Sequence, residues 1–416
     1  MENKKNILEI CNWLWIWWTE KTLQIFCKYL DKNKYNVFTC WIFKWWEREE
    51  LIKEHVLDLL VANWDTEKIK EFTLKNNINI VHWHSITQSP WIEFEKSLEL
   101  LKFFKDNNIK IIETSPFALY NKEVDDLLNY RFFVSKNTLL KFIQKFKINI
   151  NNNKYDYLYN PIDINLLEFN KITNEERVNI RKKIWIKNDD ILVWMIWRDD
   201  LWRWDDNFLY LISKLSNDKN IKFIFKKIPE YYKSKIKKRL LSKCIFLDLS
   251  SNEVDISNFH QIIDINLHDT RLWETFWLSI AESIFYNKIV LTQYIDYTNK
   301  YLFDRNSWQF EFLEYYDNLF FYQTKKDLLN IFNKIINNTN FKSNNQYLNK
   351  FDIYNPVIIL NKFDYILNNN FINNELNCEF EKYEKLYNYK FKKKEKILVY
   401  LYNNFKWLYY YLINKL

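Results

Sequence analysis

The sequence of 416 residues contains no glycine. An average usage of about 7% would give roughly 29 glycines in a chain of this length. Alanine occurs three times and proline five times, whereas tryptophan, normally among the rarest residues, occurs 19 times. These counts exclude collagen-like and Gly/Pro-rich disordered proteins, while 48% hydrophobic and 27% charged residues are ordinary for a globular protein.

Cysteines and long apolar runs are also scarce. The five scattered cysteines have no paired spacing, which predicts reduced thiols and argues against a disulfide scaffold, a redox motif or a metal-binding motif. No stretch of 18 apolar residues is present, so no membrane span is expected. The N-terminal residues do not have the pattern of a signal peptide, which favours a cytoplasmic protein.

The charge balance is modestly positive, at 61 Lys and Arg against 53 Asp and Glu, or +8. A charge of this size suits phosphate-bearing small molecules or an anionic membrane surface. It is weak evidence for nucleic acid, and no nucleic-acid partner is expected.

The tryptophans cluster at the ends of expected strands, within residues 12–20, 44–47, 194–204 and 272–278. Such junctions favour a residue without a Cβ atom, because positive φ angles and close approach to phosphate require it. With glycine in place of tryptophan, the first cluster reads NGLGIGGTE and the last reads RLGETFGLSIAE. The hypothesis is that a UGA codon read as glycine in the source organism has been translated here as tryptophan. The alternative is a genuine tryptophan-rich protein whose indoles stack on sugars or bases.

Short apolar strands alternate with helical stretches along most of the chain. The predicted strands are 7–11, 36–41, 78–82, 110–113, 131–135, 155–159, 191–196, 221–225, 244–247, 263–267 and 288–292. The predicted helices are 19–30, 47–61, 67–76, 92–106, 206–215, 230–241, 254–260 and 278–286. This alternation favours parallel, doubly wound sheets.

A break at residues 160–163 divides the pattern into two similar halves. The predicted domains are a Rossmann-like unit over 1–163, a second Rossmann-like unit over 164–370 and a basic, aromatic tail over 371–416. Ligands of such sheets bind beyond the carboxyl ends of the strands, so the site is expected between the halves.

Two glutamates follow the strand predicted at 263–267. Glu274 falls in the loop and Glu282 about one turn into the next helix. The main-chain N–H groups of Phe276, Trp277 and Leu278, at the start of that helix, form a natural anion site. The alternative for the two glutamates is a solvated helix face.

Arg198 and Arg203 follow the strand predicted at 191–196. Two guanidinium groups across a tight loop can clamp a diphosphate and offset the charge of a leaving group, although they could also pair with neighbouring aspartates. The loop through Trp17 and Trp18, as glycine, would offer backbone amides to a phosphate or a sugar. It lacks the lysine of a P-loop and gives no clean dinucleotide fingerprint.

Two histidines, His82 and His84, end another strand, and alternation places them on the same side. No further ligands at sensible spacing complete a metal site there, so none is predicted. Hydrogen-bonded histidines that pack the strand end are the alternative interpretation. His268 and Asp269, at the end of the strand before Glu274, are expected to shape the donor pocket or to cap it.

These motifs resemble the family-four retaining glycosyltransferases of GT-B fold, in the same order over residues 7 to about 292. The matching segments are Trp17-Trp18-Thr19-Glu20, His82-Trp83-His84, Asn160-Pro161-Ile162-Asp163, Trp197-Arg198 with Arg203-Trp204, and Trp273-Glu274-Thr275-Phe276-Trp277-Leu278 through Glu282. The resemblance implies an α/β protein with two Rossmann-like domains that face each other across a cleft. It also implies a hexosyltransferase that moves a sugar from a nucleotide-diphosphate sugar with retention at the anomeric carbon and without a metal or other cofactor.

The same resemblance implies roles for individual residues. Glu282 would hold the ribose hydroxyls of the nucleotide, and Glu274 would contact the donor sugar. Arg198 and Arg203 would bind the diphosphate, and His84 would lie near the sugar on the opposite wall. The acceptor would be a glycan or a lipid-linked sugar, as in cell-surface polysaccharide biosynthesis.

The chain departs from the pattern of this family at three points. Arg203 stands where the family usually has lysine, which keeps the charge but changes its geometry. Asn160-Pro161 replaces the usual Asn-Gly, and tryptophan stands wherever the family has glycine. If these indoles are genuine, the donor site is closed.

The tail predicts a basic, aromatic amphipathic helix over 391–416, which could lie on an anionic membrane near a lipid-linked acceptor. A helix packed back on the protein is the alternative. Two other functions stay open: a tryptophan-rich protein that binds carbohydrate or nucleic acid without catalysis, and a nucleotide-sugar epimerase or phosphorylase on the same fold.

Overall fold

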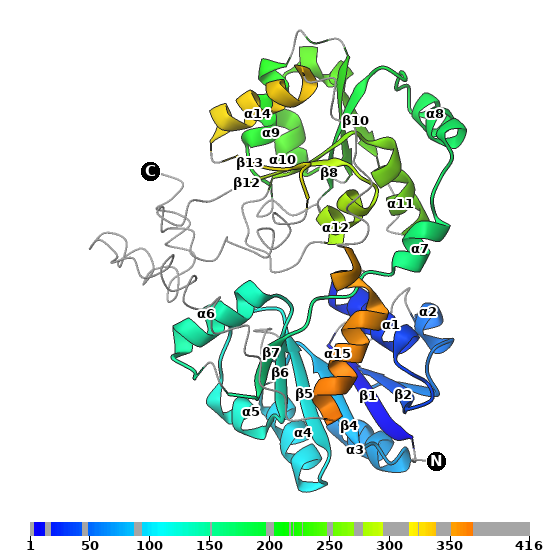
Figure 1. The fold of residues 1–416 in the computed structure, drawn as a ribbon, viewed down its shortest axis with the longest axis vertical. Helices are drawn as coiled ribbons and strands as arrows, with labels where there is room; N and C mark the ends of the chain where they lie inside the picture. Colours follow the sequence, from blue (N-terminus) through cyan, green and yellow to red (C-terminus); the bar gives the residue numbers. More distant parts are fainter. Residues whose placement is uncertain are drawn as a thin grey trace, which may run out of the picture.

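The computed structural model describes fourteen segments of the chain. They are residues 4–12, 18–43, 49–86, 94–149, 152–196, 204–215, 218, 220–226, 228–247, 253–269, 278–293, 316–322, 324–337 and 351–368. Their strands form two separate parallel sheets, one above the other in Figure 1.

The first unit is a seven-stranded parallel sheet with helices on its faces. Its strands are β1 (Lys5–Cys11), β2 (Tyr35–Trp41), β3 (Asp58–Val61), β4 (Ile80–His84), β5 (Lys110–Ser115), β6 (Tyr130–Phe133) and β7 (Tyr155–Tyr157). Its helices are α1 (Trp18–Tyr29), α2 (Glu49–Lys53), α3 (Thr66–Lys75), α4 (Phe94–Asp106), α5 (Lys122–Leu127) and α6 (Lys136–Phe146). The strand order is β3-β2-β1-β4-β5-β6-β7.

The second unit is a six-stranded parallel sheet in the order β10-β9-β8-β11-β12-β13. Its strands are β8 (Ile191–Ile196), β9 (Ile221–Lys226), β10 (Cys244–Leu247), β11 (Ile265–His268), β12 (Ile289–Gln293) and β13 (Leu319–Tyr322). The helices from residue 164 onward are α7 (Ile164–Phe169), α8 (Asn174–Lys183), α9 (Asn207–Lys214), α10 (Glu230–Lys235), the 3-10 helix η1 (Lys238–Lys243), α11 (Glu253–Ile262), α12 (Leu278–Phe285), α14 (Lys325–Asn337) and α15 (Pro356–Asn368).

Each sheet has a point where the chain reverses its direction of travel across the strands. In the first sheet this switch lies between β1 and β4, and in the second it lies between β8 and β11. The segments that follow these strands are 13–17, 85–93, 197–203 and 270–277. Open α/β sheets bind their ligands beside such switch points, and the motifs of the sequence fall in these segments or in the strands and helices next to them. The expected pair of doubly wound, Rossmann-like sheets is therefore confirmed.

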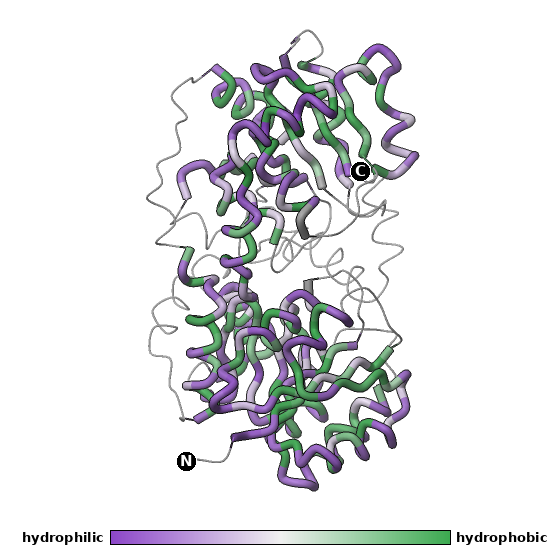
Figure 2. Tube along the Cα trace, turned by 90° about the vertical axis from the view of Figure 1, so that its right-hand side faces the viewer, coloured by the Kyte–Doolittle hydropathy of each residue, from purple (hydrophilic) through white to green (hydrophobic). Residues whose placement is uncertain are grey.

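The strands read as apolar runs because helices cover both faces of each sheet. Leu23, Phe26 and Cys27 on one stripe of α1, and Leu30 directly after it, are buried against the first sheet, as their i, i+3, i+4, i+7 spacing predicts. Figure 2 shows the apolar segments gathered in the strands and the hydrophilic ones on the outer helices. Within the described part of the chain, no helix is both long and apolar enough to cross a membrane.

The helix α15 returns from the end of the second unit to the first. Figure 1 shows it beside α1, and the two helices are in contact. Ile359, Leu360 and Phe363 belong to the same apolar cluster as Ile7 and Leu23. The sequence boundary at 370 groups these residues with the second unit, but they pack on the first.

Two predicted helices differ from the structure. The span 230–241 divides into α10 and the 3-10 helix η1, and the span 47–61 contains the short helix α2 and the strand β3. A short apolar run such as Leu57 to Val61 fits a buried helix turn or an edge strand equally well, and periodicity cannot separate them. The strand predicted at 78–82 begins and ends two residues later, so that both histidines lie within β4.

Candidate functional site

The structure places three of the predicted site residues with their side chains: His84 at the end of β4, Leu278 at the start of α12, and Glu282 in its second turn. Trp18 begins α1. The remaining ones lie outside the described residues: Trp17, Arg198, Arg203, Glu274, Phe276 and Trp277.

Glu282 is held by groups from both units. Its Oε1 atom is 2.9 Å from Nζ of Lys21, in the first turns of α1, and its Oε2 atom is 3.1 Å from Nε2 of His260 on α11. Only 5% of Glu282 is exposed. The alternative interpretation of a solvated helix face is therefore wrong for this residue, and the Lys21–Glu282 ion pair joins the two units at the switch-point ends of their sheets.

The surroundings of Glu282 keep its carboxylate ionised. Burial alone would favour the neutral acid, but the charge of Lys21 and the hydrogen bond with His260 outweigh it and lower the pKa of Glu282 to about 2. Burial lowers the pKa of His260, although Glu282 opposes this shift, and His260 Nδ1 lies 2.9 Å from Oγ of Ser283. An ionised carboxylate can accept hydrogen bonds only, so it suits the hydroxyl groups of a ligand.

Asp269, directly after β11, is hydrogen-bonded to α9 and to β13. Its Oδ1 atom accepts hydrogen bonds from Nδ2 of Asn207 at 2.8 Å and from the hydroxyl of Tyr322 at 2.6 Å, and its Oδ2 atom accepts one from the main-chain N–H of Phe208 at 3.2 Å. The carboxylate therefore connects the start of α9 and the end of β13 to the end of β11.

The surroundings of Asp269 also change its titration. Burial, together with the charge of Asp205, raises the pKa of Asp269 to about 7. His268 is turned toward β12, with Nδ1 3.1 Å from Oγ1 of Thr292, and burial lowers its pKa to about 3.

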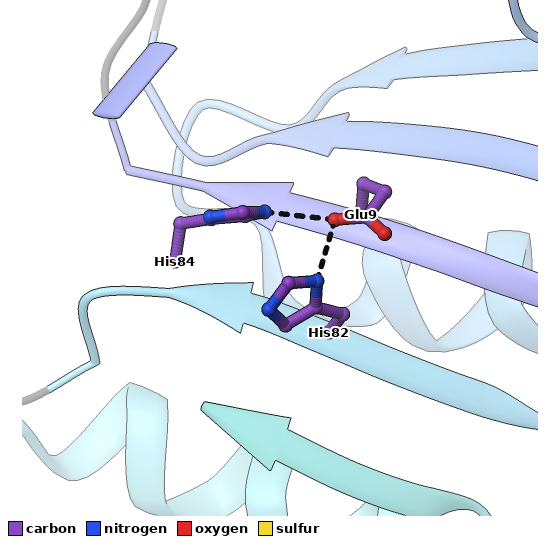
Figure 3. A group of neighbouring side chains, drawn as sticks. All are labelled: Glu9, His82 and His84. Atoms are coloured by element: carbon purple, nitrogen blue, oxygen red, sulfur yellow. Dashed lines mark hydrogen bonds and ion pairs between the residues drawn. The ribbon is translucent and has the colours of Figure 1, made fainter. Parts of the chain in front are cut away.

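A buried cluster of Glu9, His82 and His84 lies between β1 and β4 (Figure 3). Both imidazoles converge on Oε2 of Glu9, with His82 Nδ1 at 2.9 Å and His84 Nε2 at 2.8 Å. Glu9 is not among the site residues predicted from the sequence. The only sign of it in the sequence is a single carboxylate among the apolar residues of the strand predicted at 7–11. Burying a carboxylate is unfavourable unless other groups pair with it.

The electrostatics of this cluster favour an ionised carboxylate beside a neutral His84. Burial raises the pKa of Glu9, but the charge and hydrogen bonds of the two histidines outweigh it and lower the pKa to about 2. Burial and the charge of His82 lower the pKa of His84 to about 4. Two imidazoles and a carboxylate also form a ligand set for transition metals, and their ligand atoms lie within 4.8 Å of one another.

Among the described residues, Trp64 and Trp185 adopt the left-handed backbone conformation that favours glycine. Trp185 has φ of 62° and occupies the position after the C-cap of α8. Its N–H bonds to the carbonyl of Lys182, and the N–H of Ile186 bonds to that of Arg181, which is the Schellman pattern whose usual residue here is glycine. Its side chain is 91% exposed, so no burial offsets the strain. Trp64, after β3, has φ of 58°.

The buried indoles leave polar atoms unsatisfied. Trp41, Trp64 and Trp194 bury an Nε1–H group that has no hydrogen-bond partner among the described residues. Buried tryptophans ordinarily find one, and leaving such a donor unpaired costs about 1–3 kcal/mol. Trp83 differs, because its Nε1–H donates to Oδ1 of Asn12 at 3.0 Å.

The chain contains two Rossmann-like sheets, and Lys21 and Glu282 pair at the switch-point ends of both. Comparison with solved structures identifies this class of α/β fold. The chain is similar to Alr3699/HepE from Anabaena in complex with UDP, with a TM-score of 0.67, 14% identity and coverage of 88% of this chain and 99% of that chain. It is similar to a glycosyltransferase from Rickettsia africae, with a TM-score of 0.62, 18% identity and coverage of 92% and 99%. It is also similar to the UDP-GlcNAc 2-epimerase from Neisseria meningitidis, with a TM-score of 0.54, 10% identity and coverage of 87% and 99%.

These similarities show that the chain has the GT-B fold. No protein-family model matches the chain, and a search of the curated proteins finds no match.

Proposed function

We propose that the protein is a retaining glycosyltransferase of family-four type, a hexosyltransferase that moves a sugar from a nucleoside diphosphate sugar to a glycan or lipid-linked acceptor. The observation that carries this proposal is Glu282. It is an ionised, buried carboxylate at the switch-point end of the second sheet, and Lys21 of the first unit contacts it at 2.9 Å. The Anabaena protein, which has the same fold, was crystallised with UDP, with UDP and glucose, and with UDP-glucose.

The proposed mechanism is electrostatic. Glu282 accepts hydrogen bonds from the ribose hydroxyls, and the N–H groups at the start of α12 face the diphosphate. Arg198 and Arg203 offset the charge that develops on the departing nucleoside diphosphate, while Glu274 and His84 contact the donor sugar. The acceptor hydroxyl attacks from the face that the leaving group vacates, which retains the anomeric configuration.

The proposal includes glycine at the positions printed as tryptophan. The Schellman position of Trp185 and the left-handed conformation of Trp64 support it, as do the three unpaired buried indole N–H groups of the described residues. A glycine at 17, 18 and 277 would leave room for a phosphate beside the backbone, whereas an indole would fill that space. Membrane contact through residues 391–416 and a cytoplasmic setting also belong to the proposal, and residues 391–416 lie outside the described part of the chain.

The experiment compares two chains, one as printed and one with glycine at all 19 tryptophan positions. Each is incubated with a panel of nucleoside diphosphate sugars and a mixture of glycan and lipid-linked acceptors, and the released nucleoside diphosphate is measured. We expect acceptor-dependent release from the glycine chain only. Release by neither chain with any donor would contradict the transferase function, and equal turnover by both would contradict the glycine assignment.

The similarity to the Neisseria epimerase makes epimerisation the outcome to separate from transfer. The same reactions are therefore analysed for the sugar that remains on the nucleotide. Formation of an epimerised donor in the absence of acceptor would identify the protein as an epimerase instead of a transferase.

A further inference from the structure

The carboxylate of Glu9 is shielded from solvent, and no lysine or arginine of the described segments bonds to it. Glu9, on β1, pairs in register with His82 on β4, and both residues are fully buried. Its Oε2 atom faces both imidazoles, whereas its Oε1 atom has no hydrogen-bond partner there. Burying a carboxylate costs free energy of desolvation. A protein retains a buried carboxylate only where neighbouring groups pair with it.

The geometry fixes where the proton of each imidazole lies. An ionised carboxylate accepts hydrogen bonds and cannot donate them, so the nitrogen facing it must carry hydrogen. His84 therefore has its hydrogen on Nε2, and His82 has one on Nδ1. In neutral His84 the other nitrogen, Nδ1, keeps a free lone pair, and no group among the described residues donates to it.

We propose that Glu9 is a positioning residue that holds His84 as the Nε2–H tautomer, so that Nδ1 of His84 accepts a hydrogen bond from a hydroxyl of the bound sugar. This inference rests on the proposed function for the identity of the ligand. Its tautomer part stands on the chain alone. The chemistry it selects is a hydroxyl donor at the end of β4, and a sugar that lacks this hydroxyl would be bound less well.

The packing around the cluster supports a fixed orientation of the rings. Phe26 of α1 lies 5.0 Å from the ring of His82 and 5.4 Å from that of His84. Phe363 of α15 lies 4.9 Å from the ring of His82. The two imidazoles are themselves 4.2 Å apart. Since aromatic rings pack against both imidazoles, His84 keeps its hydrogen bond to Glu9 without a conformational cost at each turnover.

His82 serves as the inner support of this arrangement. Its second nitrogen, Nε2, lies 2.7 Å from Oγ1 of Thr114 on β5. Hydrogen bonds therefore join Thr114 of β5 to His82 and Glu9 to His84, and an ion-pair contact of 2.9 Å links His82 to Glu9. Of these residues, His84 stands at the last position of its strand.

A metal ion is the competing occupant of this cluster. A cation bound between the three side chains would take the Nε2 lone pair of His84, which requires the hydrogen to lie on Nδ1. The two alternatives therefore predict opposite tautomers of the same ring.

The test is a two-dimensional ¹⁵N–¹H spectrum of the imidazole groups in the full-length protein, labelled on histidine and recorded at pH 7 without donor. The chain has five histidines, so each is assigned by its own substitution to glutamine. We expect His84 to be neutral with hydrogen on Nε2. A spectrum that shows hydrogen on Nδ1, or an imidazolium, would overturn the proposal without any variant of Glu9.

Two variants then connect the tautomer to the sugar. In Glu9→Gln we expect His84 to exchange between tautomers and kcat/KM for the donor to fall about tenfold, the effect of losing about one hydrogen bond to the bound sugar. Thr114→Val is the matched control, because it removes the second partner of His82 and leaves Glu9 and His84 in contact. It should keep the His84 tautomer, because Nε2 of His84 still faces Oε2 of Glu9. An unchanged tautomer in Glu9→Gln would refute the role of Glu9.

The outcomes separate this inference from the proposed function. If the protein shows the expected tautomer but releases no nucleoside diphosphate, the positioning role of Glu9 stands and the transferase function is contradicted. If the protein turns over donor with His84 in the other tautomer, only the positioning role of Glu9 is contradicted. One equivalent of a transition metal in the purified protein, absent from His84→Gln, would assign the cluster to the metal instead.

Discussion

The buried ionisable residues of the first sheet make the stability of the protein depend on pH. His84 has an ordinary pKa near 6.5 and a pKa of about 4 in the folded chain. A group with a lowered folded pKa contributes stability above its ordinary value, and this contribution is lost as the pH falls toward the folded value. The window for His84 is therefore pH 6.5 to about 4.

We expect the free energy of unfolding to decrease by about 3 kcal/mol more in the parent chain than in His84→Gln across that window, because each pH unit between the two pKa values corresponds to about 1.36 kcal/mol. Urea unfolding at several pH values measures it. His55→Gln is the control, because the pKa of His55 is lowered by burial and by Lys28 in a far more open site, and its removal should change the slope less. An identical pH dependence of the unfolding free energy in all three proteins would show that burial does not disfavour the charged form of His84.

Single residues also limited what the sequence could reveal. The pairing of His82 and His84 on one side of a strand was predictable from alternation, because side chains of a strand alternate faces. Their shared partner was not, since Glu9 lies far earlier in the chain and only the β1–β4 register brings it opposite. The same holds for Lys21, whose contact with Glu282 depends on how two separate sheets meet.

At the scale of elements, the ends of helices show most directly which residues the backbone requires. The C-terminus of α8 closes as a Schellman motif with Trp185 in the left-handed region. We expect Trp185→Gly to stabilise the protein by about 1 kcal/mol, because glycine removes a steric cost of about 1–2 kcal/mol and loses some conformational entropy.

The midpoint of urea unfolding measures this effect. Ile184→Gly is the matched control one residue earlier, where φ is −103° and glycine brings no relief, so that variant should be less stable than the parent. Destabilisation by Trp185→Gly equal to that of Ile184→Gly would contradict the argument from backbone conformation.

The helix α15 makes a second prediction at this scale. Phe363 is fully buried against the first sheet and the ring of His82, although the second unit precedes it in the chain. Phe363→Ala should cost about 3–5 kcal/mol of stability in the first unit. Hydrogen exchange should therefore accelerate in β1 and β4. Tyr365→Ala, at an exposed position of the same helix, is the control and should leave exchange unchanged.

Most elements were predictable because apolar runs of strand length alternate with amphipathic helices. The run at β8, Ile191–Ile196, has the bounds that its composition predicts. The return of α15 was not predictable, since its sequence shows an apolar stripe but not which sheet receives it. The short edge strand β3 was not predicted for a related reason, because Asp58–Val61 is too short for its side chains to show a periodic pattern.

At the scale of the whole molecule, one ion pair links the two sheets at their switch points. Lys21 and Glu282 expose only 13% and 6% of their side chains, so their attraction is weakly screened. In a double-mutant cycle of Lys21→Met and Glu282→Gln, we expect a coupling free energy of about 1–2 kcal/mol.

The cycle is measured by urea unfolding of the parent, the two single variants and the double variant. Lys68→Met, which breaks an exposed pair with Asp65 inside the first unit, is the control and should leave the stability unchanged. Additive effects of the two substitutions would mean that the pair does not join the units.

The two-sheet arrangement could be predicted from the sequence, because apolar strands alternate with helices in two similar halves. The proposed ligand, a nucleoside diphosphate, rests on Glu282. The most direct test is a calorimetric titration of a panel of nucleoside diphosphates into the chain with glycine at the tryptophan positions and into its Glu282→Gln variant, with the exposed Glu168→Gln as control. The account predicts that one of them binds and that its binding weakens about tenfold in Glu282→Gln alone, the effect of about one lost hydrogen bond to a charged group. Equal affinity in all three proteins, or no binding of any nucleoside diphosphate by the parent, would contradict it.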